Sequence, residues 1–171
     1  MDRKYELYTS LVDSLDNLVK TYRVLLDLVR KERDILVSVN MDELNENNRA
    51  KELTVGKIKM LEQTRAKIAR DLSKETNGNV DFPRLSELAS AFNGEDGDRL
   101  RNLQSVLDLL LKRVAEINKD NEVLVANALQ TVNGAMNAIK DTLQEKPTYQ
   151  KHGGLASVGQ GAAGQIVSRE I

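Results

Sequence analysis

The sequence predicts an all-α protein: an elongated antiparallel helical hairpin that becomes a bundle of three long helices, with a short connector helix and a disordered C-terminal tail. Three long stretches repeat apolar residues at alternating four- and three-residue spacings, the pattern of helices that lie along one another. The chain of 171 residues contains only 2 prolines and 4% aromatic residues, as amphipathic helices do. We expect one helical domain over residues 1–147 and a flexible, glycine-rich tail over 148–171.

The first long helix is expected over residues 2–39. Glu32 is the only charge on its apolar stripe. Asn40 then provides an N-cap, and Glu43 lies three residues further on, which is the spacing of a capping box. So short a connection forces the next helix back antiparallel. The stripe consists of Tyr8, Leu11, Leu15, Leu18, Tyr22, Leu25, Val29, Glu32, Leu36 and Val39.

The second helix, expected over residues 41–73, has an unusually polar inner face. In a hairpin that turns near residue 40, Glu32 lies opposite Asn48 and Lys51. These residues form either a polar binding site or an ion pair that sets the register of the hairpin, and we favour the ion pair. The inner face consists of Leu44, Asn48, Lys51, Val55, Ile58, Glu62, Arg65, Ala69 and Leu72.

A short connector helix is expected over residues 84–92, and a long helix over residues 100–143. The long helix has one inner stripe and then acquires a second, outer one, so its second half has two apolar faces. We interpret the outer stripe as a surface that holds a partner. The inner stripe is Leu103, Leu107, Leu110, Val114, Ile117, Asn121, Leu124 and Ala128. The outer stripe is Val125, Leu129, Val132, Met136, Ile139 and Leu143.

Two asparagines, Asn118 and Asn121, lie one turn apart where the outer stripe begins. An amide on an inner face usually bonds to another helix or to a backbone carbonyl. It can also bind the main chain of a bound peptide. The spacing leaves both interpretations open.

Composition argues against catalysis, and we expect no enzyme, cofactor or metal site. His152 is the only histidine and lies in the tail, whereas a di-iron bundle needs two histidines on helices. There is no cysteine and no phosphate-binding loop. A net charge of −1 does not favour nucleic acid, and no apolar run is long enough to enter a membrane. We expect a cytoplasmic protein.

The order of several features resembles the FlgN family of flagellar export chaperones over about residues 5–153. These features are a long helix containing residues 25–32, the pair Glu62 and Arg65, a connector at residues 85–88, the pair Asn118 and Asn121, and a glycine-containing tail with Tyr149. The resemblance implies a cytosolic chaperone without ATPase activity. The partners that it implies are the hook-associated proteins FlgK and FlgL, bound through their amphipathic C-terminal segments, and the export-gate component FlhA.

The resemblance and the outer stripe predict one cargo surface on the last helix, and the family pattern assigns Tyr149 to the export gate. Two alternatives remain: a homodimer that buries the outer stripe against its own copy, and a chaperone for another secreted helical protein. The predicted cargo residues are Asn118, Asn121, Val125, Leu129, Val132, Met136, Ile139 and Leu143.

Overall fold

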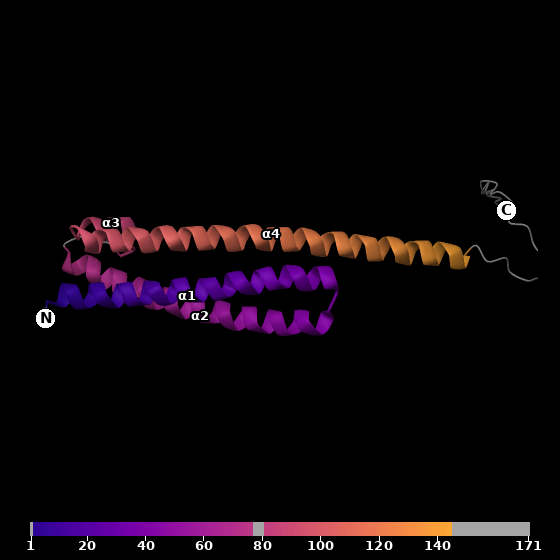
Figure 1. Ribbon diagram of the computed structural model, residues 1–171, viewed down its shortest axis with the longest axis horizontal. Coiled ribbons are helices and arrows are strands. Elements are labelled where there is room, and N and C mark those ends of the chain that lie inside the picture. Colours follow the sequence, from indigo (N-terminus) through magenta and orange to yellow (C-terminus); the bar gives the residue numbers. More distant parts are fainter. Residues whose placement is uncertain (1, 77–80, 145–171) are drawn as a thin grey trace, which may run out of the picture. The chain divides into compact units, whose positions relative to one another are not determined.

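A computed structural model describes residues 2–76 and 81–144, and every element in these ranges is a helix. In chain order they are α1 (Arg3–Ser38), α2 (Met41–Glu75), α3 (Leu85–Ser90) and α4 (Glu95–Gln144) (Figure 1). The predicted all-α class is confirmed, and the helix ends differ from the predicted ones by a few residues. The predicted tail, with Tyr149 and His152, lies outside the described residues.

The chain divides into two units, Met1–Ala126 and Asn127–Ile171. The first unit holds α1, α2, α3 and the first part of α4, together with the buried core. Of the second unit, the structure describes the last turns of α4, up to Gln144.

The turn between α1 and α2 is as short as predicted. Val39 takes a left-handed conformation with φ of 56°, which ends α1. The side chain of Asn40 then caps α2 by accepting a hydrogen bond from the backbone N–H of Glu43 at 3.2 Å. The assignment of Val39 to the inner stripe was wrong, because the left-handed turn leaves this side chain 76% exposed.

Helix α4 runs parallel to α1 and antiparallel to α2 within the first unit. Near the start of both helices, the Tyr8 hydroxyl donates to the backbone carbonyl of Asp96 at 3.1 Å. Further along both helices, the side-chain amide of Asn121 donates a hydrogen bond to the backbone carbonyl of Val29 at 3.0 Å. Residue numbers therefore increase in the same direction along α1 and α4, as in parallel helices. The most deeply buried large side chains between the helices include Leu11, Leu15, Leu18, Val29, Leu72 and Leu100.

The inner face of α2 differs from the predicted one at two positions. Asn47 is buried where Asn48 was expected, and Thr54 is half-buried where Val55 was expected; both predicted residues are exposed. The order of three- and four-residue steps between Leu44 and Ile58 is therefore the reverse of the predicted one. Apolar spacing could not reveal this, because few large apolar side chains mark this face.

Helix α4 begins at Glu95, five residues before the predicted start. Gly94 supplies a positive φ of 64°, and Glu95, Asp96 and Asp98 place negative charge at the helix N-terminus. Gly97 then lies against the end of the connector. A Cβ atom at this position would lie 2.5 Å from the carbonyl oxygen of Phe92 and 2.7 Å from that of Ala89.

We expect Gly97→Ala to lower the free energy of unfolding by about 1–3 kcal/mol, because the added methyl group meets backbone that has to shift. Chemical denaturation measures the change. Gly134→Ala is the matched control, since a Cβ atom there meets nothing within 4 Å. The control should be neutral or stabilising by up to about 1 kcal/mol. Equal effects at the two glycines would contradict the close contact.

Candidate binding surface on the last helix

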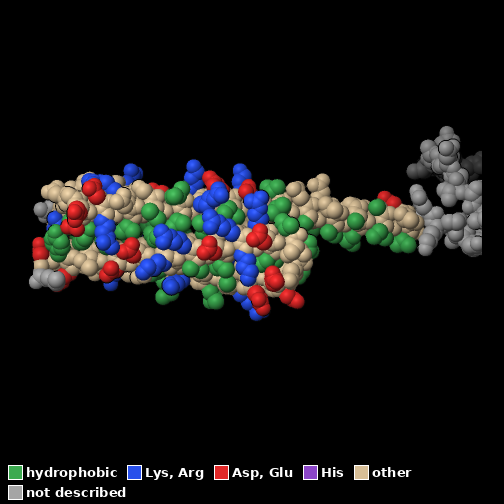
Figure 2. All heavy atoms as spheres, in the orientation of Figure 1, with side chains coloured by type: hydrophobic (Ala, Val, Ile, Leu, Met, Phe, Trp, Pro, Cys, Tyr) green, Lys and Arg blue, Asp and Glu red, His purple; other side chains and the backbone are tan. Residues whose placement is uncertain are grey.

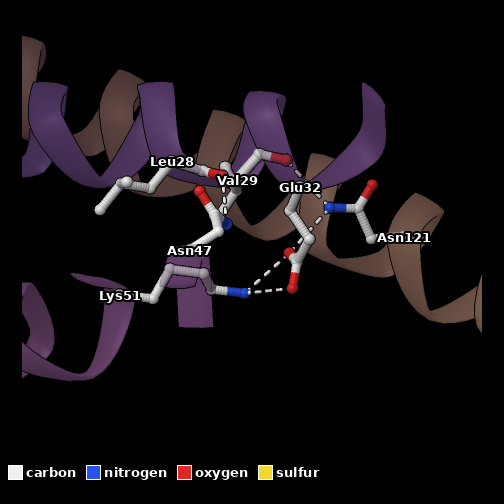
Figure 3. A network of polar contacts seen from close by, with 6 residues as sticks. All are labelled: Leu28, Val29, Glu32, Asn47, Lys51 and Asn121. Carbon is white, nitrogen blue, oxygen red and sulfur yellow. Dashed lines mark hydrogen bonds and ion pairs between the residues drawn. The ribbon is translucent and has the colours of Figure 1, made fainter. Parts of the chain in front are cut away.

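Glu32 of α1 joins all three long helices through its carboxylate (Figure 3). Lys51 of α2 donates to both oxygens, at 2.7 and 2.8 Å. Asn121 of α4 donates to one of them at 2.9 Å and to the backbone carbonyl of Val29 at 3.0 Å. The predicted ion pair between Glu32 and Lys51 is confirmed. That it sets the register of the hairpin stays a prediction.

Asn47 is a member of this polar cluster that the sequence did not single out. Its amide donates to the backbone carbonyl of Leu28 at 3.1 Å, and the side chain is 3% exposed (Figure 3). Asn47 and Asn48 are both asparagines, so residue type could not have decided which of them faces α1. Because Asn47 is buried and Asn48 is exposed, the face of α2 that contains Asn47 is the one that packs against α1.

The two candidate asparagines of α4 lie in different surroundings. Asn121 is 4% exposed and donates both of its bonds to α1, as expected of an amide between helices. Its assignment to the cargo surface gains no support from this position. Asn118 is half-buried and lines a shallow groove. The groove is lined by Glu32, Leu36, Lys51, Asn118, Asn121, Glu122, Val125 and Ala126.

All residues of the outer stripe are exposed to solvent on α4. Each residue from Val125 to Gln144 is exposed, including Ala128, which was expected on the inner stripe. The six large apolar side chains of the outer stripe are each 49–63% exposed. Their spacing of three and four residues keeps them on one side of the helix. Figure 2 shows hydrophobic side chains along this part of α4.

A comparison with protein-family models identifies the chain. The model described as FlgN protein matches residues 1–157. The chain belongs to the FlgN family. FlgN proteins are chaperones of flagellar export, not enzymes, and their partners are hook-associated proteins of the flagellum. No curated protein and no solved structure matches the chain.

The Glu62–Arg65 pair, part of the pattern that resembles FlgN, forms an ion pair within α2. Arg65 Nε lies 2.8 Å from a carboxylate oxygen of Glu62. Burial, with the nearby negative charge of Glu62 as the next cause, raises the pKa of the Tyr22 hydroxyl on α1. Glu62 and Arg65 also line a pocket, together with Phe82 and Leu107.

Residues 2–76 and 81–144 contain no group of three or more histidine, cysteine, aspartate and glutamate side chains that could hold a metal ion. No helix among them is long and apolar enough to cross a membrane. The outer stripe is a row of six large apolar side chains on α4, each of them exposed.

Proposed function

We propose that this FlgN protein is a cytoplasmic, ATP-independent chaperone that holds the amphipathic C-terminal segment of unassembled FlgK or FlgL against the outer stripe of α4. The observation that carries the proposal is the exposure of all six stripe residues on one side of a single helix. Soluble proteins rarely leave so many large apolar side chains together without a partner.

The energy available from the outer stripe is sufficient for capture without ATP. Complete burial of six such side chains contributes on the order of 10 kcal/mol before the costs of ordering the partner. Met136 adapts to irregular surfaces because its side chain is unbranched and polarisable. Ala128 and Ala135, which the helical repeat puts beside the outer stripe, let a second helix approach closely. An amphipathic segment that forms a helix on binding fits such a surface.

The direct test is calorimetric titration of the full chain with a synthetic peptide of the C-terminal segment of FlgK or FlgL. We expect saturable binding with a negative heat-capacity change, since apolar surface is buried. Circular dichroism should show added helix in the complex, and ATP should change neither result. Absence of binding to both peptides would refute the proposed cargo, and a chaperone for another secreted protein would then be favoured.

A homodimer through the outer stripe is the competing outcome, because the same side chains could bury against a second copy. Light scattering after size exclusion, over a wide range of concentrations, distinguishes the two. We expect a dimer through the outer stripe to dissociate when the peptide binds. A dimer that persists unchanged while the peptide binds would show that the outer stripe is not the shared surface.

Truncation after Pro147 should leave cargo binding unchanged and weaken binding to FlhA. The tail from 148 to 171 has few large apolar side chains, and Tyr149 is the residue that the family pattern assigns to the gate. Tyr149→Ala in the full chain should therefore weaken binding of the cargo complex to FlhA roughly tenfold or more, as loss of an aromatic anchor does. Calorimetry measures both affinities. Loss of cargo binding on truncation would contradict the assignment.

A further inference from the structure

Gly56 lies in the interior of α2, and no contact among the described residues explains a glycine there. A Cβ atom at this position would meet nothing within 4 Å. Glycine destabilises the interior of a helix relative to alanine, because it loses more conformational freedom on folding. Its advantage is that another backbone can approach closely. A second helix packed on this side of α2 would therefore account for Gly56.

The side of α2 that contains Gly56 lies opposite the face that packs against α1, and it presents apolar side chains to solvent. Leu53 is 78% exposed and Met60 is 70% exposed, the largest values among the large apolar residues of this helix. The helical repeat puts both of them beside Gly56 and opposite the buried Ile58. With two charged residues they form an outer face of α2, all of it exposed, that consists of Glu52, Leu53, Gly56, Lys59 and Met60.

Charges along α2 change sign at Gly56. Residues 41–55 contain four acids and two bases, a net charge of −2, whereas residues 57–71 contain five bases and two acids, a net charge of +3. On the outer face, Glu52 precedes Gly56 and Lys59 follows it; neither forms an ion pair with another described residue. A second α2 in the same direction would place like charges together, and one in the opposite direction would place acids beside bases. Charge complementarity therefore favours an antiparallel copy of the same helix.

We propose that this protein forms a homodimer in which the α2 helices of two copies pack antiparallel and cross at Gly56 on a twofold axis. Residues about equally far before and after Gly56 then face each other, and symmetry repeats each contact. The helical repeat puts Leu53 and Met60 on one flank of Gly56, and Glu52 and Lys59 on the other. Leu53 therefore packs against Met60 of the second copy, and Glu52 pairs with its Lys59.

The contact uses no residue of the outer stripe, so the inference goes beyond the proposed function and does not depend on the cargo. Each copy brings two large apolar side chains and two charges to the crossing, which makes a small interface. We expect a dissociation constant on the order of 1–100 μM. It should increase with salt, because the charges are exposed.

Sedimentation equilibrium of the full chain tests the dimer, with charge reversals on the outer face as probes. Glu52→Lys and Lys59→Glu each place like charges together in the antiparallel arrangement, so each should raise the dissociation constant at least about tenfold. Both changes in one chain restore opposite charges across the axis and should restore dimerisation. A parallel pair of helices would show neither the loss nor the recovery. An equimolar mixture of the two single variants should form a heterodimer.

Gly56→Glu should abolish the dimer, because it places bulk and like charges at the crossing. It should not lower the melting temperature, since the position is open and glutamate favours a helix more than glycine does. Gly134→Glu is the matched control: it makes the same change at a glycine of α4 where a Cβ atom also meets nothing within 4 Å. The control should dimerise as the unchanged protein does.

Three results would overturn the proposal. The first is a chain that stays monomeric at millimolar concentration in low salt. The second is a dimer whose dissociation constant the single charge reversals leave unchanged. The third is a dimer that Leu129→Asp abolishes and Gly56→Glu does not, which would assign the contact to the outer stripe.

Discussion

Leu129→Asp and Ile139→Asp are each expected to abolish binding of the FlgK or FlgL peptide while leaving the fold intact. Each change removes a large apolar contact and places a charge against the partner. The loss should be at least about 3 kcal/mol, more than a hundredfold in Kd. Both side chains are about three-fifths exposed in the free protein, so the melting temperature should hardly change. Calorimetry and thermal melting measure the two effects.

The matched control is Asn127→Asp, which introduces the same charge on the same helix. The helical repeat puts residue 127 nearly opposite the outer stripe, and its side chain is exposed. We expect this variant to bind nearly as the unchanged protein does. If Leu129→Asp instead unfolds the protein, or binds the peptide normally, the outer stripe is not the cargo surface.

The helices and the hairpin register could be predicted from sequence because long periodic patterns and a short turn leave little freedom. Glu32 interrupts an otherwise apolar stripe, and the turn at Asn40 places Lys51 opposite it. The ion pair between them follows from this spacing. The inner face of α2 could not be predicted as well, because Asn47 and Asn48 have the same chemistry, and only packing against α1 distinguishes them.

The start of α4 depends on contacts that no periodic pattern records. Gly94 has a positive φ, and the backbone at Gly97 lies against the backbone carbonyls of Ala89 and Phe92 at the end of the connector. The candidate binding surface, too, was predictable from sequence only in part. The outer stripe was predictable from spacing and is exposed as a set. The burial of Asn121 depends on a carbonyl of α1, which spacing alone could not identify.

Lys51→Ala is expected to lower the free energy of unfolding by about 2–4 kcal/mol. The Glu32 side chain is 13% exposed and that of Lys51 is 22% exposed. Removing the ammonium group leaves a largely buried carboxylate with only the Asn121 amide as a described partner, and unpaired buried charge is costly. Urea denaturation measures the effect. Arg33→Ala is the control: Arg33 lies 3.9 Å from Asp120 in an exposed pair, and its loss should cost less than about 1 kcal/mol.

The double variant Glu32→Leu with Lys51→Leu separates the cost of an unpaired charge from the value of the pair itself. Replacing both partners by apolar residues removes the unpaired carboxylate, so the double variant should be more stable than Lys51→Ala. It also deprives Asn121 of one acceptor, and this limits the recovery, because an amide N–H that loses its partner is left unsatisfied. If Lys51→Ala unfolds at the same urea concentration as the unchanged protein, the ion pair does not hold the hairpin in register.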